Sequence, residues 1–376
     1  MKILLPTLFI LGISITNAQQ TITSSIMHDG LQRSYILYIP ASYSAGTDAP
    51  LVMNFHGYTS NATEQMFYAD FRPIADTAGF LLVHPEGTLD GSNETYWNAD
   101  WGGTVDDIGF TAALIDSLSA QYSINQDRVY STGMSNGGFM SYTLACSLSD
   151  RIAAIASVTG SMNTGQSLNC NPQHPMPVME IHGTSDAVVP YIGSVNISPI
   201  SSVLSYWVNT NVCDVTPIET AVPDLVLGDG CTATHFVYEN GNSGVEVEHY
   251  RINLGGHTWP GAPFAIGTTN YDINASEKIW EFFAQYDIYG KISADVDELD
   301  DLTLKVYPNP AHSVIQLDGI DMKPGATVEI QNSYGQTVAF FDQPQGKLNV
   351  SKLPAGIYFL QVFNDNTAHS VRFIKQ

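Results

Sequence analysis

The chain has 376 residues, of which 44% are hydrophobic, and its 14 Lys and Arg face 37 Asp and Glu for a formal net charge of −23. This length predicts about two domains, and so acidic a surface repels phosphate groups, which excludes nucleic acid and anionic lipid as partners. The charge is uneven, because residues 302–376 hold six basic and five acidic side chains, while residues 1–301 hold eight and thirty-two.

The first 18 residues have the pattern of a secretory signal peptide. One Lys precedes an apolar run from Ile3 to Ile15, and Thr16-Asn17-Ala18 supplies a small-residue cleavage site. The run is shorter than the ~20 residues that span a bilayer, and no later segment is long and apolar enough. We therefore expect residues 1–18 to be removed on export, and we expect no membrane span.

Residues 19–290 alternate strands with helices. This alternation predicts an α/β domain with a mostly parallel sheet that helices cover on both faces. The expected strands are 21–27, 33–39, 51–55, 80–84, 128–132, 153–158, 178–182 and 245–252, with 235–239 pairing against the last as a hairpin. The expected helices are 62–77, 107–122, 138–148, 200–209 and 276–286.

Residues 133–137 have the sequence Gly-Met-Ser-Asn-Gly and lie between an apolar strand and a helix. The pattern G-x-S-x-G at such a turn is typical of a nucleophile elbow, in which a strained backbone exposes the serine hydroxyl. Glycine on either side tolerates the crowding of that turn. Ser135 is therefore the candidate nucleophile, although the same pattern also occurs in structural turns.

A serine nucleophile needs a general base, and the base needs an acid that orients it. Asp186 follows the expected strand 178–182, and His257 lies in a glycine-rich loop after strand 245–252. Taken alone, Asp186 is typical of a helix cap and His257 of a loop residue. The three residues occur in the order of α/β-hydrolase triads, each at the C-terminal end of a strand, and this joint placement favours a catalytic triad.

The oxyanion of such a reaction is expected to bind two backbone N–H groups. One belongs to Asn136, directly after the nucleophile. The other is expected from the turn after strand 51–55, where His56-Gly57 lets the chain bend toward Ser135. The N–H of Tyr58 is then the second donor, and the Tyr58 ring forms one wall of the pocket.

Several motifs together resemble a known family. They are Phe55-His56-Gly57, Val105-Asp106-Asp107-Ile108-Gly109-Phe110, Arg128-Val129-Tyr130, Gly133-Met134-Ser135-Asn136-Gly137-Gly138 and Gly255-Gly256-His257-Thr258-Trp259-Pro260-Gly261. They resemble the secreted polyhydroxybutyrate depolymerase, feruloyl esterase and acetylxylan esterase group of α/β-hydrolases, over roughly residues 22–288. The resemblance implies the α/β-hydrolase fold and maps the triad of the family onto Ser135, Asp186 and His257. Many members carry Cys where this chain has Tyr58. The resemblance therefore does not identify the pocket wall at this position, nor the acyl group that packs against it.

Aromatic residues gather in the loops near the expected site. Flat rings suit a sugar face, a feruloyl ring or a polyester chain. We expect substrate contacts from Tyr58, Trp97, Trp101 and Trp259, the last because it lies two residues from His257. Trp97 and Trp101 are equally typical of core anchors.

Four cysteines suit an exported protein. Cys146, Cys170, Cys213 and Cys231 permit three pairings, and proximity in sequence favours Cys146–Cys170 and Cys213–Cys231, which the family resemblance also implies. None of the four has the spacing of a metal site. We expect neither a metal nor a cofactor.

Beyond an acidic linker at residues 291–301, residues 302–376 carry short expected strands divided by Gly and Pro turns. This pattern predicts a small all-β sandwich. Tyr307-Pro308-Asn309-Pro310, Leu353-Pro354-Ala355-Gly356-Ile357-Tyr358 and the basic ending Arg372-Phe373-Ile374-Lys375-Gln376 resemble the C-terminal sorting domain of type IX secretion in Bacteroidota. The resemblance implies the type IX machinery as a partner and a secreted or cell-surface location. A carbohydrate-binding module is the alternative.

The expected function is that of a secreted serine esterase, acting as a monomer on a neutral, polymeric ester. Feruloyl or acetyl esters of plant polysaccharides are the leading substrates. The alternative is a depolymerase of polyhydroxybutyrate or of an aromatic polyester such as poly(ethylene terephthalate). A catalytically inactive binding protein on the cell surface is the remote alternative.

Overall fold

The computed structural model describes residues 19–292 and 304–376, except 320–322, 324, 333–335, 343, 345 and 365–366. The expected signal peptide and nearly all of the expected acidic linker lie outside the described residues. Contacts divide the chain into two compact units, with the division after residue 293. Within the described residues, no helix is long and apolar enough to cross a membrane.

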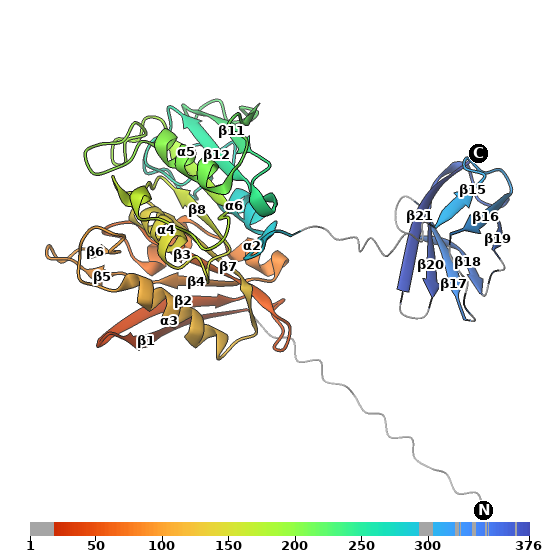
Figure 1. The fold of residues 1–376 in the computed structure, drawn as a ribbon, viewed down its shortest axis with the longest axis horizontal. Helices are drawn as coiled ribbons and strands as arrows, with labels where there is room; N and C mark the ends of the chain where they lie inside the picture. The colour runs from red at the N-terminus through yellow and green to blue at the C-terminus, as the bar shows by residue number, and fades with distance from the viewer. Residues whose placement is uncertain are drawn as a thin grey trace, which may run out of the picture. The chain divides into compact units, whose positions relative to one another are not determined.

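The first unit is built on one ten-stranded sheet with six parallel strands at its centre (Figure 1). Antiparallel strands extend the sheet at both edges. The central strands are buried along most of their length, as expected where helices cover both faces. In order across the sheet the strands are β1 (Gln20–His28), β2 (Leu31–Ile39), β4 (Leu81–Pro85), β3 (Ala49–Phe55), β7 (Ile124–Met134), β8 (Ala154–Val158), β9 (Val178–Gly183), β12 (Val247–Asn253), β11 (Thr232–Tyr238) and β10 (Ile218–Ala221).

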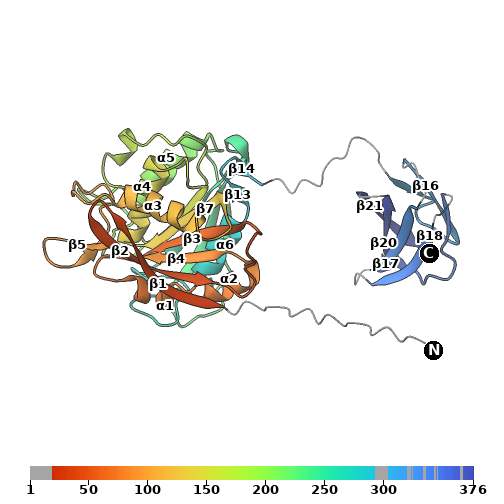
Figure 2. The ribbon, with the colours of Figure 1, turned by 90° about the horizontal axis from the view of Figure 1, so that it is seen from below.

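Helices cover both faces of this sheet (Figure 2). One face carries α3 (Asp107–Ser119), α4 (Asn136–Ser147) and α5 (Ile200–Asn211). The other carries α1 (Ala62–Tyr68), α2 (Arg72–Ala78) and α6 (Ala275–Phe283). The expected α/β fold is confirmed.

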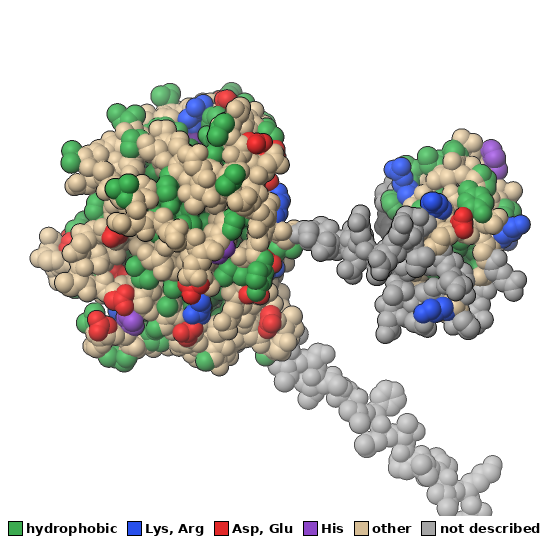
Figure 3. Space-filling view, viewed as in Figure 1, with side chains coloured by type: hydrophobic (Ala, Val, Ile, Leu, Met, Phe, Trp, Pro, Cys, Tyr) green, Lys and Arg blue, Asp and Glu red, His purple; other side chains and the backbone are tan. Residues whose placement is uncertain are grey.

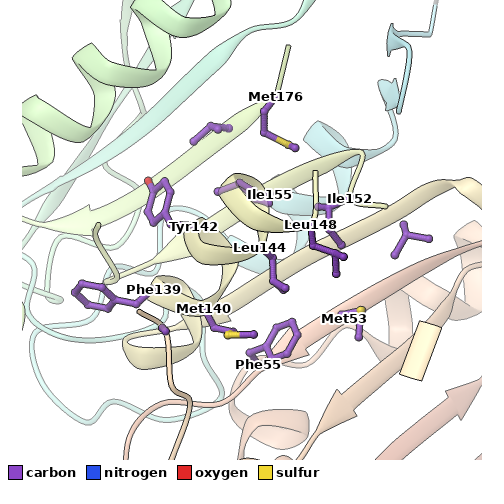
Figure 4. Close-up of a cluster of buried hydrophobic side chains, with 14 of the residues drawn as sticks. Met53, Phe55, Phe139, Met140, Tyr142, Leu144, Leu148, Ile152, Ile155 and Met176 are labelled. Carbon is purple, nitrogen blue, oxygen red and sulfur yellow. The ribbon is translucent and has the colours of Figure 1, made fainter. Parts of the chain in front are cut away.

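Helix α4 is buried on nearly all sides, which fixes the turn that precedes it. Its apolar side chains pack against residues of β3 and β8, among them Met53, Phe55 and Ile155 (Figure 4). Short elements complete the unit: β5 (Thr88–Leu89), β6 (Thr95–Tyr96), β13 (Tyr286–Asp287), β14 (Gly290–Lys291) and the 3₁₀ turns Gln166–Leu168 and Asn242–Gly244.

The expected helix 62–77 is wrong as a single element, because the chain breaks between α1 and α2. A continuous helix would place Pro73 in its interior, where the ring clashes with the carbonyl of Ala69 and one N–H is missing. Ala69 instead leaves the helical region with φ −111° and ψ 65°. Pro73 then lies in the first turn of α2, where it is tolerated.

The second unit is the expected small β-sandwich. One sheet has three strands, β15 (Lys305–Tyr307), β16 (Val314–Asp318) and β19 (Lys347–Asn349). The other has four, β17 (Thr327–Asn332), β18 (Thr337–Asp342), β20 (Gly356–Asn364) and β21 (Thr367–Lys375). Both contribute to one hydrophobic core. Lys and Arg recur on the described surface of this unit, whereas Asp and Glu recur on the drawn face of the first unit (Figure 3).

Candidate active site

Ser135 lies at the sharp turn between β7 and α4, as predicted. Its backbone is in a positive-φ region, with φ 55° and ψ −118°, a strained conformation of the kind that clusters at functional sites. The flanking glycines are required by crowding. A Cβ on Gly133 would lie 2.6 Å from the carbonyl oxygen of Phe55, and a Cβ on Gly137 would overlap that same carbonyl.

Asp186 and His257 meet beside this turn. The Nδ1–H of His257 donates to Oδ2 of Asp186 at 2.7 Å, while Oδ1 of Asp186 accepts the N–H groups of Val188 and Val189 at 2.8 Å. Burial alone raises the pKa of the Asp186 carboxyl, but these hydrogen bonds outweigh it and hold the pKa below its ordinary value. Because Nδ1 carries the proton, Nε2 of His257 is left as the base. Ser135 and His257 line the same cavity.

A buried hydrogen-bonded chain continues behind Asp186. Nε2 of His182 lies 3.4 Å from Oδ2 of Asp186 and 2.8 Å from the carbonyl oxygen of Val189. Nδ1 of His182 lies 2.8 Å from Glu180, whose other oxygen accepts the Tyr142 hydroxyl at 2.8 Å. Burial lowers the pKa of His182, but Glu180 and the Val189 carbonyl outweigh it and raise the pKa above its ordinary value. The positive charge of the protonated form of His182 contributes to lowering the pKa of Asp186.

The two residues expected to donate N–H groups to the oxyanion flank the serine. A Cβ on Gly57 would lie 3.4 Å from Cβ of Ser135, so the end of β3 comes directly against the nucleophile. Tyr58 and Asn136 line one cavity together with Ser135. The Tyr58 hydroxyl donates to Asp90 at 2.8 Å, which holds the ring at the cavity mouth.

The side chain of Asn136 has a role that the sequence did not indicate. Its Oδ1 accepts the backbone N–H of Trp97 at 2.7 Å, and its Nδ2 donates to the Trp97 carbonyl at 3.1 Å. The Trp97 indole N–H in turn donates to the carbonyl oxygen of His56 at 3.0 Å. These bonds tie the elbow, the Trp97 segment and the end of β3 into one unit.

Two cavities border Ser135, and Tyr58 lines both. We call the larger, of about 540 Å³, the main arm, and the smaller, of about 270 Å³, the ring arm. The main arm is lined by α1 residues and by a loop after His257 that carries Phe264 and Ile266. The ring arm is lined by Tyr58, Tyr96, Trp101, Ser135, Asn136, Phe139, Val189 and Ile197.

Of the four aromatic residues expected to contact substrate, two are exposed at the cavities and two are buried. Tyr58 and Trp101 line the cavities, and each exposes nearly half of its surface. The prediction for Trp97 is wrong, since its ring is fully buried with its edge against Phe55. Trp259 is also buried and borders neither arm, because its indole points into the core and donates to Ser276 at 3.2 Å.

One of the two expected disulfides is present. Cys146 and Cys170 are bonded and join the end of α4 to a loop. The predicted Cys213–Cys231 bond is wrong, because both residues carry free, buried thiols in the described structure. Cys231 precedes β11, whereas Cys213 packs at its other end beside Gly241. At roughly 3.3 Å per residue, the seven residues of β11 place the two cysteines much farther apart than the ~7 Å limit between the Cα atoms of a disulfide.

The fold is that of the α/β-hydrolase class, and Ser135, Asp186 and His257 lie in the arrangement that a serine hydrolase requires. Residues 33–215 match the family described as esterase PHB depolymerase, and residues 305–376 match the secretion system C-terminal sorting domain. The chain is therefore a carboxylic ester hydrolase that is similar to this esterase family, and it carries a sorting domain that directs it through type IX secretion to the outside of the cell.

Named relatives are similar to this chain in sequence, and a solved structure is similar to it in fold. A bifunctional acetylxylan esterase/xylanase of Neocallimastix patriciarum is 26% identical over 276 residues, covering 73% of this chain and 36% of the relative. Feruloyl esterase D of Neurospora crassa is 25% identical over 279 residues, 71% of this chain and 86% of the relative. The structure of an acetyl xylan esterase from Aspergillus awamori matches with a TM-score of 0.51 at 14% identity, covering 71% of this chain and 99% of that one, and supports the fold.

Proposed function

We propose that this esterase releases feruloyl or acetyl groups from plant cell-wall polysaccharides. The observation that carries the proposal is the pair of arms around Ser135. The ring arm, walled by Tyr58, Tyr96, Trp101 and Phe139, suits a flat acyl group at about 270 Å³. The main arm is twice as large and leads away along α1, so it suits the alcohol part of the ester. The names of the feruloyl and acetylxylan esterase relatives favour the same substrates.

The reaction follows from the geometry of the site. Nε2 of His257 takes the proton of the Ser135 hydroxyl, whose oxygen attacks the ester carbonyl carbon. His257 then returns the proton to the departing alcohol, leaving an acyl group on Ser135. Water attacks this acyl group with the same base, and the free acid leaves.

Three groups stabilise the intermediates of this reaction. Asp186 holds the tautomer of His257 through the 2.7 Å hydrogen bond and stabilises the imidazolium. The N–H groups of Asn136 and Tyr58 bind the oxyanion. Donors fixed in a dry pocket are effective because they need no reorganisation as charge develops.

A polyester depolymerase is the second candidate. The exposed apolar side chains of Phe67, Phe264 and Ile266 along the main arm favour it, since a polyester chain presents apolar faces. An inactive binding protein is disfavoured by the intact Asp186–His257 pair beside Ser135.

We further propose the domain organisation of the chain. Residues 19–290 form the catalytic domain, residues 291–301 a linker and residues 302–376 the sorting domain, with residues 1–18 a signal peptide. The catalytic domain acts as a monomer. Its substrate is a neutral polymer, because the net negative charge of the domain disfavours anionic substrates.

The test is hydrolysis by the protein and by its Ser135→Ala variant, with Ser205→Ala as a control on the exposed side of α5. The substrates are methyl ferulate, feruloylated oligosaccharide, acetylated xylan, polyhydroxybutyrate film and poly(ethylene terephthalate) film. We expect release of ferulate or acetate that Ser135→Ala abolishes and Ser205→Ala leaves intact. Turnover of the films alone would replace this proposal with the polyester one, and turnover that survives Ser135→Ala would reject the triad.

A further inference from the structure

A third cavity, of about 580 Å³, lies beyond the main arm and shares three of its residues. Phe67, Tyr68 and Phe264 line both, so a chain bound in the main arm continues past these rings into the next cavity. Its far wall comes from the break between α1 and α2, where Asp70 and Arg72 line it. We call it the distal cavity. Neither Ser135 nor His257 reaches it, so its contribution is to binding rather than chemistry.

The boundary between the main arm and the distal cavity consists of exposed rings. Phe67 exposes 51% of its surface and Phe264 55%, although both are large apolar side chains on a folded domain. Phe264 leans against Tyr68 with ring centroids 5.1 Å apart, which holds it in place. Rings that are fixed and yet exposed provide flat apolar faces on which the C–H face of a sugar ring can pack.

A charged pair stands beside these rings in a fixed geometry. The Arg72 side chain donates twice to Asp70, at 2.8 Å from Nε and 2.8 Å from Nη2. The guanidinium also lies 4.7 Å from the centroid of Phe67, so it is held by both neighbours. Both members of the pair are partly exposed to the solvent.

The chemistry of these groups selects their ligand. The pair has no net charge, so it suits a neutral molecule, and it offers both a carboxylate acceptor and N–H donors. A sugar hydroxyl uses both, since it donates and accepts. A polyester repeat has only carbonyl and ether oxygens, so it adds no hydrogen bond to the Asp70 carboxylate. The pair and the rings together therefore favour a hydroxyl-rich ring over a polyester.

We propose that the distal cavity is a subsite for a sugar residue of the polysaccharide main chain, several atoms away from the ester that Ser135 attacks. The sugar face packs on Phe67 and Phe264, and its hydroxyls bond to Asp70 and Arg72. The subsite rests on the proposed function, because it assumes that the alcohol part of the ester is a polysaccharide. It makes the enzyme prefer esters on long chains to small esters.

Two variants test the subsite without touching the residues around Ser135. Arg72→Ala removes the guanidinium, and Asp70→Asn removes the negative charge of the carboxylate. Arg151→Ala is the matched control, since Arg151 forms a similar pair with Asp116 at 2.7 Å elsewhere on the surface. Thermal unfolding of each variant shows whether it folds. For each, kcat/KM is measured on methyl ferulate and on a feruloylated xylan oligosaccharide of several sugar units.

We expect both subsite variants to lose tenfold or more in kcat/KM on the oligosaccharide ester and less than twofold on methyl ferulate. The control is expected to change neither. Equal losses on both substrates, or no loss on the oligosaccharide, would overturn the subsite while leaving the esterase proposal intact.

A binding measurement makes the result independent of turnover. The unesterified xylan oligosaccharide is titrated into Ser135→Ala protein and into the Ser135→Ala/Arg72→Ala double variant, with binding followed by calorimetry. We expect weaker binding by the double variant. If the Ser135→Ala protein does not bind the oligosaccharide, the subsite is rejected, whereas absence of wild-type turnover on every ester rejects the proposed function.

Discussion

Replacing Asn136 with Ala tests whether the elbow is held by its side chain as well as by its backbone. The amide of Asn136 pairs with both the N–H and the carbonyl of Trp97, at 2.7 and 3.1 Å. Both partners belong to a residue that is fully buried. The Asn136→Ala substitution would leave these two backbone groups without a partner and out of reach of water.

The size of the effect follows from the number of groups left unpaired. A buried donor or acceptor that loses its partner costs about 1–3 kcal/mol, so two of them cost about 2–6 kcal/mol. The better helix propensity of Ala offsets roughly 0.5 kcal/mol of this loss, because residue 136 lies in the first turn of α4. The net loss in the free energy of unfolding is then about 2–5 kcal/mol, a fall in Tm on the order of 10 °C for a domain of this size.

Urea denaturation of the wild type, Asn136→Ala and Asn136→Asp measures this loss. The Asp variant keeps the acceptor but loses the donor, so its stability should also fall. Gln121→Ala is the control, because the Gln121 amide also makes two hydrogen bonds, both exposed to water. If Asn136→Ala loses no more than Gln121→Ala, the elbow is held by packing alone and the reasoning is refuted.

Three further outcomes are expected. A thiol reagent should label Cys213 and Cys231 only in denaturant, because burial raises the pKa of Cys213 to about 11 and that of Cys231 to about 12; rapid labelling of the native protein would contradict this. Burial lowers the pKa of His84 to about 3. The unfolded chain therefore binds more protons than the folded chain below pH ~6.5. As a result, the free energy of unfolding falls by roughly 1.4 kcal/mol per pH unit as the pH drops toward 3. Urea denaturation at several pH values should give a shallower decline for His84→Phe, and an equal slope would exclude His84 as a cause. Tyr142→Phe removes the hydroxyl that donates to Glu180 at 2.8 Å and should cost about 1–3 kcal/mol in the same denaturation assay; a loss below ~0.5 kcal/mol would mean that Glu180 finds another donor.

The central sheet and the elbow could be predicted because their signals are local. Parallel strands buried on both faces are continuous apolar runs, and a glycine on each side of Ser135 follows from crowding at one turn. The placement of Asp186 and His257 followed from a rule of topology, since strand ends of a parallel sheet lie at one edge. The hydrogen bond between His257 and Asp186 follows from this shared position at the edge of the sheet.

The features that the sequence did not predict depend on tertiary contacts. Trp97 and Trp101 lie four residues apart in one loop, yet one is fully buried and the other 43% exposed. No local pattern distinguishes them, because the burial of Trp97 depends on Phe55 and on the amide of Asn136. The thiols of Cys213 and Cys231 are close in sequence, but a whole strand separates them in space.

The two arms that meet at Ser135 have two lining residues in common, Tyr58 and the serine itself. On the proposed assignment of the arms, substitutions at Trp101 or Phe139 therefore alter the room for the acid without disturbing the path of the alcohol. Substitutions at Phe67 or Phe264 do the reverse. Selection, or a designer, can thus vary the two halves of the ester independently and combine the results on one unchanged catalytic centre. Tyr58 is the exception, because any change there alters both halves at once.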